Sequence, residues 1–222
     1  MIRNYRDLTR LEMEQVNKDE TIVLIPLGAL EQHGNQAPLG TDDIIAEAMT
    51  DYIRRELEGE PSSEDSDFPM LVFPVIPIGL STDHRNFCGS ITLKPDTYYH
   101  MLYDISTSLV HHGFKKLAFL VCHGGNAPIV QVLSRELRSE FGISPFILSS
   151  GAFSHPDVTA TISEGNIWDF HGGEMETSMV MAVDPSLVKL DTSKAGIPTA
   201  FKDNQALRPD ALTLTLSHGE RE

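Results

Sequence analysis

Four polar stretches of the chain place histidine or carboxylate side chains beside glycines. The first is PLGALEQHGNQAPLGTDD, residues 26–43, which holds Glu31, His33 and Asp42. Glu31 and His33 are two residues apart, so in an extended segment they point to the same side. Histidine and carboxylate donors without cysteine suit Zn²⁺, Mn²⁺ or Fe²⁺. Asp42 and Asp43 also match the acidic first turn of a helix, which is the plainer interpretation of either aspartate alone.

The second stretch, VCHGGNAP, repeats this pattern after another apolar run. His123 precedes two glycines that allow a tight turn and a close approach to a ligand. Asn126 could cap the helix that follows, and Pro128 suits its first turn. A buried histidine with satisfied hydrogen bonds is the alternative to a metal ligand here.

The third stretch, WDFHGGEMETSMVMAV, places His171 before Glu174 and Glu176. We expect the run after the glycines to form a buried helix, where a carboxylate needs a partner or a metal. Glu174 lies near the helix start and can be explained by the helix dipole, whereas Glu176 is harder to explain in that way. The choice between these two glutamates as a ligand stays open on this pattern alone.

The fourth stretch, GLSTDHRNFCGSITL, contains His84, and by itself it favours an exposed polar loop. The four stretches together are more informative. Two histidines and three carboxylates are enough for two divalent ions that share a bridging carboxylate. Such a pair lowers the pKa of a bound water and polarises a carbonyl group.

Short apolar strands that alternate with amphipathic helices must position these residues. The strands are expected at 21–28, 69–79, 115–122 and 144–150, and the helices at 43–57, 97–112 and 127–141. Continuous apolar strands of this kind are typical of a parallel sheet covered on both faces. We therefore expect an α/β fold in a single domain over residues 1–222, with a surface loop at 58–69. The part from about residue 191 is expected to be loop-rich.

Composition narrows the class of partners. The chain has 222 residues and a formal net charge of −15, which argues against nucleic acid or an anionic membrane as a partner. The two cysteines form no CxxC pair and the charged N-terminus is no signal peptide, so we expect a cytoplasmic protein. No apolar run approaches the roughly 20 residues that span a bilayer.

The motifs PLGALEQHGNQAPLGTD, GLSTDHRNFCGSITL, HGGN and HGGEMETS resemble the creatininase family, creatinine amidohydrolase-like proteins, in the expected order. The resemblance implies a three-layer α/β/α sandwich with a mostly parallel sheet, assembled as a homohexamer. It also implies two divalent metal ions per chain (Zn, Mn or Fe). The expected activity is hydrolysis of the C–N bond of a small-molecule amide, cyclic amide or formamide by a hydroxide that bridges the metals.

The resemblance assigns roles position by position. Glu31 and His123 match ligands of one metal, and Asp42 matches the bridging aspartate. His33 and Glu176 match ligands of the other metal, and His171 matches a histidine proposed to pass a proton to the leaving nitrogen. His171 and Glu176 are thus the expected catalytic residues. The expected substrate contacts are Gln36, His84, Gly124, Gly125 and Trp168.

The chain departs from the family pattern at three places. Gln36 stands where the family often has a histidine, and Gly125 stands where creatininase itself has a glutamate. The ending ALRPDALTLTLSHGERE differs from the Gly-rich ending of the family, so a truncated or altered C-terminus is expected.

Several functions stay open at this point. Peptide-maturation protease and keto-sugar hydrolase are alternatives within the enzyme class. A catalytically impaired or non-catalytic metal-binding protein is the alternative outside it. A nucleotide-binding protein would need a GxGxxG or P-loop motif, and neither occurs.

Overall fold

The computed structural model describes residues 2–59, 69–149 and 171–193. They belong to two compact units: residues 2–32, 39–59 and 69–149 lie in the first, and residues 33–38 and 171–193 in the second. The single-domain organisation stays a prediction. The predictions for residues 60–68, for Trp168 and for the chain after residue 193 lie outside the described residues.

The first unit is built on a five-stranded sheet with the strand order β1-β3-β2-β4-β5. Every ladder in it is parallel, as predicted. Strands β2 and β4 lie next to each other near the middle of the sheet, and their residues are almost all buried, which explains their continuous apolar sequences. The strands are β1 (Ile2–Asn4), β2 (Ile22–Leu27), β3 (Met70–Val72), β4 (Lys116–Val121) and β5 (Ser144–Ser149).

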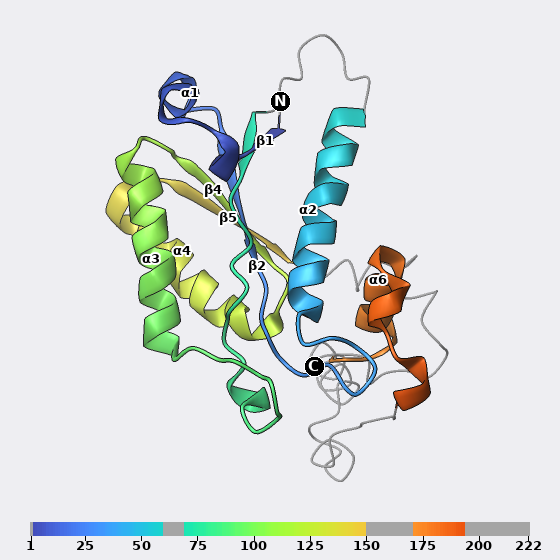
Figure 1. Ribbon diagram of the computed structural model, residues 1–222. Coiled ribbons are helices and arrows are strands. Elements are labelled where there is room, and N and C mark those ends of the chain that lie inside the picture. The colour runs from blue at the N-terminus through green and yellow to red at the C-terminus, as the bar shows by residue number, and fades with distance from the viewer. Residues whose placement is uncertain (1, 60–68, 150–170, 194–222) are drawn as a thin grey trace, which may run out of the picture. The chain divides into compact units, whose positions relative to one another are not determined.

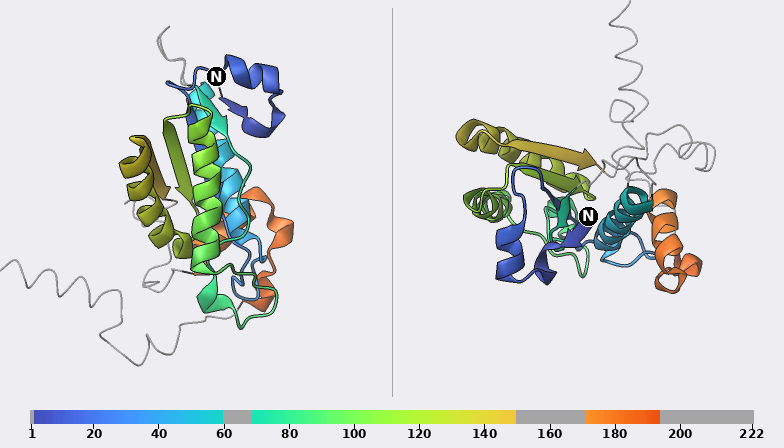
Figure 2. Two further views of the ribbon diagram at one scale, coloured as in Figure 1. Left: turned by 90° about the vertical axis from the view of Figure 1, so that its left-hand side faces the viewer. Right: turned by 90° about the horizontal axis from the view of Figure 1, so that it is seen from above.

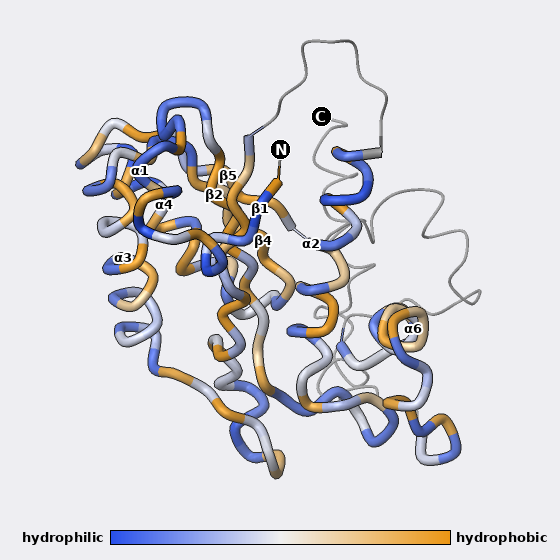
Figure 3. The backbone as a smooth tube through the Cα atoms, turned by 45° about the horizontal axis from the view of Figure 1, so that its top comes forward, coloured by the Kyte–Doolittle hydropathy of each residue, from blue (hydrophilic) through white to orange (hydrophobic). Residues whose placement is uncertain are grey.

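Helices cover both faces of this sheet. Helices α3 (Pro95–His111) and α4 (Ala127–Phe141) lie on one face, and α2 (Thr41–Gly59) lies on the other (Figures 1 and 2). The orange tube of the central strands in Figure 3 marks the apolar core between these layers. The main core cluster joins alternate residues of β2 and β4 to both α3 and α4. The expected three-layer α/β/α arrangement is therefore confirmed.

The structure corrects the predicted strand at 69–79. Strand β3 ends at Val72, and only Ile76 pairs again, in an isolated bridge with Leu27. Pro74 and Pro77 lack the N–H group that a ladder needs, so the run cannot continue as a regular strand.

Two short elements near the N-terminus were not predicted. Strand β1 pairs with β3, and α1 (Arg10–Gln15) begins at a capping box formed by Thr9 and Glu12. Both elements are short, so neither shows a hydrophobic period. None of the described helices is long and apolar enough to cross a membrane.

The second unit contains α6 (Glu174–Val183), followed by two short 3₁₀ turns, Pro185–Leu187 and Leu190–Thr192. The helix was predicted as a buried one, and the structure buries it on one face only. Thr177 and Val180 are buried on one face, whereas Met181 and Val183 are 37% and 52% exposed. Because the sequence of α6 is apolar on all sides, it does not predict which face of the helix is buried.

Candidate metal centre

The carboxyl ends of β2 and β4 bring two of the polar stretches together. Leu27 and Val121 are register partners at the ends of these strands, and Cys122 N donates to Leu27 O at 3.0 Å. Because the strands are parallel, the segments that follow them leave the sheet at the same edge. Glu31 follows one strand and His123 follows the other.

A buried cluster of two carboxylates and one imidazole lies at this edge. His123 Nδ1 is 3.3 Å from Glu31 Oε1 and 3.3 Å from Asp42 Oδ2. Glu31 is 0% exposed and Asp42 is 1% exposed. Helix α2 supplies Asp42 on its buried face, since Ile45 and Ala46, three and four residues further on, are also buried. Two buried carboxylates side by side require a compensating positive charge.

The pKa of His123 shows the effect of the two carboxylates. Burial lowers its pKa, but the hydrogen bond with Asp42 and the charges of Glu31 and Asp42 outweigh burial and raise the pKa to about 9. His123 Nε2 lies 2.8 Å from Leu80 O, which directs Nδ1 toward the carboxylates. A divalent cation at Nδ1 would supply the same compensation as the proton, so this donor set fits a metal ion.

Asn126 does not cap α4 as its position suggested, because its side chain makes no capping hydrogen bond. Its Oδ1 accepts from Leu80 N at 3.0 Å, and its Nδ2 donates to Gly28 O at 3.0 Å. Asn126 therefore ties the loop that holds His123 to the end of β2. The predicted Pro128 in the first turn of α4 is confirmed.

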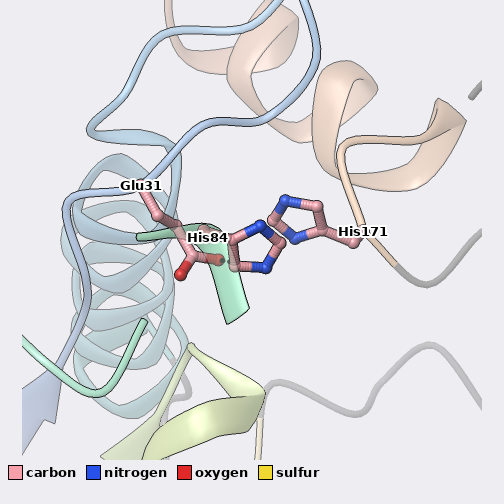
Figure 4. Close-up of side chains that lie close together, drawn as sticks. All are labelled: Glu31, His84 and His171. Atoms are coloured by element: carbon pink, nitrogen blue, oxygen red, sulfur yellow. Dashed lines mark ion pairs between the residues drawn. The ribbon is translucent and has the colours of Figure 1, made fainter. Parts of the chain in front are cut away.

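His84 lies in a short 3₁₀ turn, and its ring faces the cluster from a third loop. Its Nε2 is 3.7 Å from Glu31 Oε1, and the two side chains face each other in Figure 4. Gln32 Nε2 lies 2.9 Å from His84 Nδ1 and orients the ring. The interpretation of His84 as part of an exposed loop was therefore too simple. The sequence offered no signal for Gln32, because its partner is 52 residues away.

Asp43 belongs to the first turn of α2, as expected for a helix-start residue. Burial, together with the charges of Asp42 and Glu47, raises its pKa to about 7. Gly28 leaves room for this carboxylate, because a Cβ at that position would lie 2.0 Å from Asp43 Oδ1.

The second unit contains its own group of potential ligands. One ligand atom from each of His33, His171 and Glu176 can be chosen so that all lie within 4.8 Å of one another. His33 Nε2 is 3.8 Å from Glu176 Oε2, and the rings of His33 and His171 are 4.5 Å apart. Glu176, rather than Glu174, thus takes part in this group. The Glu176 carboxylate also accepts from Gly172 N at 2.5 Å.

The remaining predicted residues occupy distinct places. Gly124 and Gly125 form the 3₁₀ turn after His123. Gln36 is 6% exposed. The roles of all these residues as ligands, acids or substrate contacts stay predictions.

Comparison with known proteins defines the class to which this α/β chain belongs. The model of the family "Creatininase: Creatinine amidohydrolase" matches residues 6–219. The chain therefore belongs to the creatininase family.

Similar proteins include several hydrolases. The mycofactocin precursor peptide peptidase of Mycobacterium ulcerans is 30% identical over 78% of this chain and 63% of its own length. The creatinine amidohydrolase of Pseudomonas putida is 29% identical over 88% of this chain and 77% of its own length. A solved structure named "Creatininase Mn" superimposes with a TM-score of 0.72 at 28% identity, covering 87% of this chain and 77% of that chain. The chain thus spans under two thirds of the length of the peptidase relative.

Proposed function

We propose that this protein is a metal-dependent amidohydrolase that holds two divalent ions, with Zn, Mn or Fe as candidates. Glu31 and His123 would hold one ion, His33 and Glu176 the other, and Asp42 would bridge them. The observation that supports this most strongly is the buried cluster of Glu31, Asp42 and His123, in which the imidazole Nδ1 lies 3.3 Å from one oxygen of each carboxylate. When bound, the ions would activate water and polarise the carbonyl group of the substrate.

The chain's own residues would prepare this chemistry. The carbonyl of Leu80 orients His123, and Gln32 orients His84 beside Glu31. His171 would deliver a proton to the leaving nitrogen, because an imidazole can exchange protons near neutral pH.

A C–N bond of a small non-peptide amide is the substrate class that we propose. A peptide amide is the second candidate, because the peptidase relative from M. ulcerans is 30% identical. Gln36 departs from the family pattern at an expected substrate contact, and Trp168 does not clearly match the aromatic residues that enclose the ring in creatinine-specific members, so creatinine itself is not the expected substrate.

Metal content tests the proposal directly. Protein purified without chelator and then loaded with Mn²⁺ or Zn²⁺ is expected to retain about two ions per chain by elemental analysis. Asp42→Asn is expected to lose at least one ion, whereas Asp51→Asn, on an exposed part of α2, is the matched control. No retained metal in the unmodified protein would favour a non-catalytic member of the family that has lost its metal.

A substrate panel distinguishes the candidate activities. Cyclic amides, formamides and short peptides are assayed with the metal-loaded protein, and hydrolysis of a cyclic amide or formamide is the expected result. Cleavage of peptides alone would establish the second candidate. Hydrolysis by His171→Ala at the unmodified rate, with metals still bound, would contradict the proton-transfer role of His171.

The cytoplasmic location and the hexamer are further parts of the proposal. Both rest on the family resemblance and on composition. Light scattering of the purified protein tests the hexamer, and a monomer at micromolar concentration would refute it.

A further inference from the structure

Gln36 makes contacts that its place in a polar loop did not suggest. The side chain is 6% exposed, and its Nε2 donates to Gly172 O at 2.6 Å and to Thr177 Oγ1 at 3.3 Å. The backbone carbonyl of Gln36 accepts from Lys189 N at 2.8 Å. The residue therefore connects the HGNQ segment to the turn before α6, to the helix itself and to the chain beyond it.

Two glycines leave room for these contacts. A Cβ at Gly34 would lie 2.4 Å from Gln36 Oε1, and Gly34 has a φ of +73°. A Cβ at Gly172 would lie 2.8 Å from the carbonyl carbon of His33, and Gly172 has a φ of +59°. Both positions exclude a side chain, because the space is filled and the backbone is left-handed. The two turns thus pack directly against each other.

The backbone of Gly172 is the centre of this contact. The N–H of Gly172 donates to Glu176 Oε2 at 2.5 Å, and its C=O accepts from Gln36 Nε2 at 2.6 Å. His171 immediately precedes Gly172, and His33 lies in the turn against which Gly172 packs. A shift of Gly172 would therefore move His171 and Glu176 relative to His33.

The amide group suits this position chemically. An amide carries two N–H donors on one nitrogen, so it can satisfy the Gly172 carbonyl and the Thr177 hydroxyl together. One imidazole nitrogen offers a single donor. The histidine that the family often has at this position could not reproduce both bonds from one nitrogen.

We propose that Gln36 is a positioning residue that clamps the His171–Gly172 turn and the start of α6 onto the His33 turn. It thereby holds His33 and Glu176 at the separation that a shared metal ion requires. The effect on metal binding rests on the proposed function, whereas the hydrogen bonds of Gln36 are present without metal. Gln36 thus has a role other than the direct substrate contact expected from the sequence.

Hydrogen exchange of the metal-free protein tests the clamp. Gln36→Met keeps the length of the side chain and removes both donors. We expect exchange of a peptide covering residues 171–178 to rise about tenfold, with no change in α4. Thr177→Val removes only the longer bond and should give a smaller rise. Gln131→Met, on the exposed face of α4, is the matched control. Unchanged exchange at residues 171–178 in Gln36→Met would overturn the inference.

Calorimetric titration with Mn²⁺ tests the consequence. In Gln36→Met, the Mn²⁺ site proposed at His33 and Glu176 is expected to lose about 10- to 100-fold in affinity, while the other site is unchanged. A loss of this size is typical when a residue that orients a metal ligand is removed. Gln131→Met should bind as the unmodified protein does. Unchanged Mn²⁺ affinity together with a raised KM would show a substrate contact instead and overturn the inference. If the unmodified protein bound no Mn²⁺ or Zn²⁺, the proposed function would fail, and the exchange measurement would still decide whether Gln36 holds the turn.

Discussion

Gly125→Ala is expected to damage the His123 position although it adds one methyl group. A Cβ at Gly125 would lie 2.2 Å from the Leu80 carbonyl oxygen and 2.5 Å from His123 Nε2. These are the two atoms that meet at 2.8 Å and orient the imidazole. The new methyl group must therefore move the backbone at Leu80 or rotate His123. Gly124→Ala is the matched control, because nothing lies within 4 Å of a Cβ at that position.

Two magnitudes follow for Gly125→Ala. Overpacking of this kind costs about 1–3 kcal/mol of unfolding free energy. For a chain of this length, each kcal/mol lowers the melting temperature by about 2–4 °C. Misorientation of one metal ligand lowers metal affinity by about 10- to 100-fold. Both effects should be absent, or within about 0.5 kcal/mol, in Gly124→Ala.

Thermal unfolding of the metal-free proteins and titration with Mn²⁺ measure these effects separately. The reasoning is refuted if Gly125→Ala melts at the same temperature as Gly124→Ala and binds Mn²⁺ with the same affinity. Lower stability with unchanged affinity would show that the backbone at Leu80 yields and that His123 keeps its orientation.

Three further predictions concern the first unit. Leu133→Ala, in the core face of α4, should cost about 2–5 kcal/mol in urea unfolding, whereas Val132→Ala, at a side chain that is 51% exposed, should cost under about 0.5 kcal/mol. Cys88 is exposed and Cys122 is buried. Burial and two nearby aspartates raise the pKa of Cys122 to about 12, so one thiol per native chain should react with a disulfide reagent at neutral pH, and two rapid equivalents would contradict this. The pKa of His123 is raised from 6.5 to about 9 in the metal-free protein, so the stability contributed by its charge is complete below the lower value and is lost as the pH rises through the higher one. As the pH rises from roughly 6 to 10, the urea unfolding midpoint of the unmodified, metal-free protein should therefore fall. The midpoint of His123→Gln should fall by a smaller amount.

The sequence predicted the fold well where the hydrophobic period was long. The apolar runs before Gly28 and His123 became β2 and β4, and the helices at 97–112 and 127–141 became α3 and α4 within two residues. These patterns are local consequences of covering a parallel sheet on both faces. The polar residues after β2 and β4 could also be placed at one edge, because parallel strands end together. Pro74 and Pro77 follow β3 and end its ladder, whereas the prediction of a strand over 69–79 considered only the apolar character of the run.

The sequence alone also determined the family, since four motifs occur in a specific order. Only the tertiary structure decided how the candidate residues are held. The side chain of His84 is oriented by Gln32, and that of Gln36 binds Gly172, 136 residues away. The side chain of Asn126 binds the backbone of Leu80 and of Gly28. Hydrogen bonds over such separations leave no periodic signal in the chain. They arise when the sheet and the packed turns bring distant backbone groups within reach.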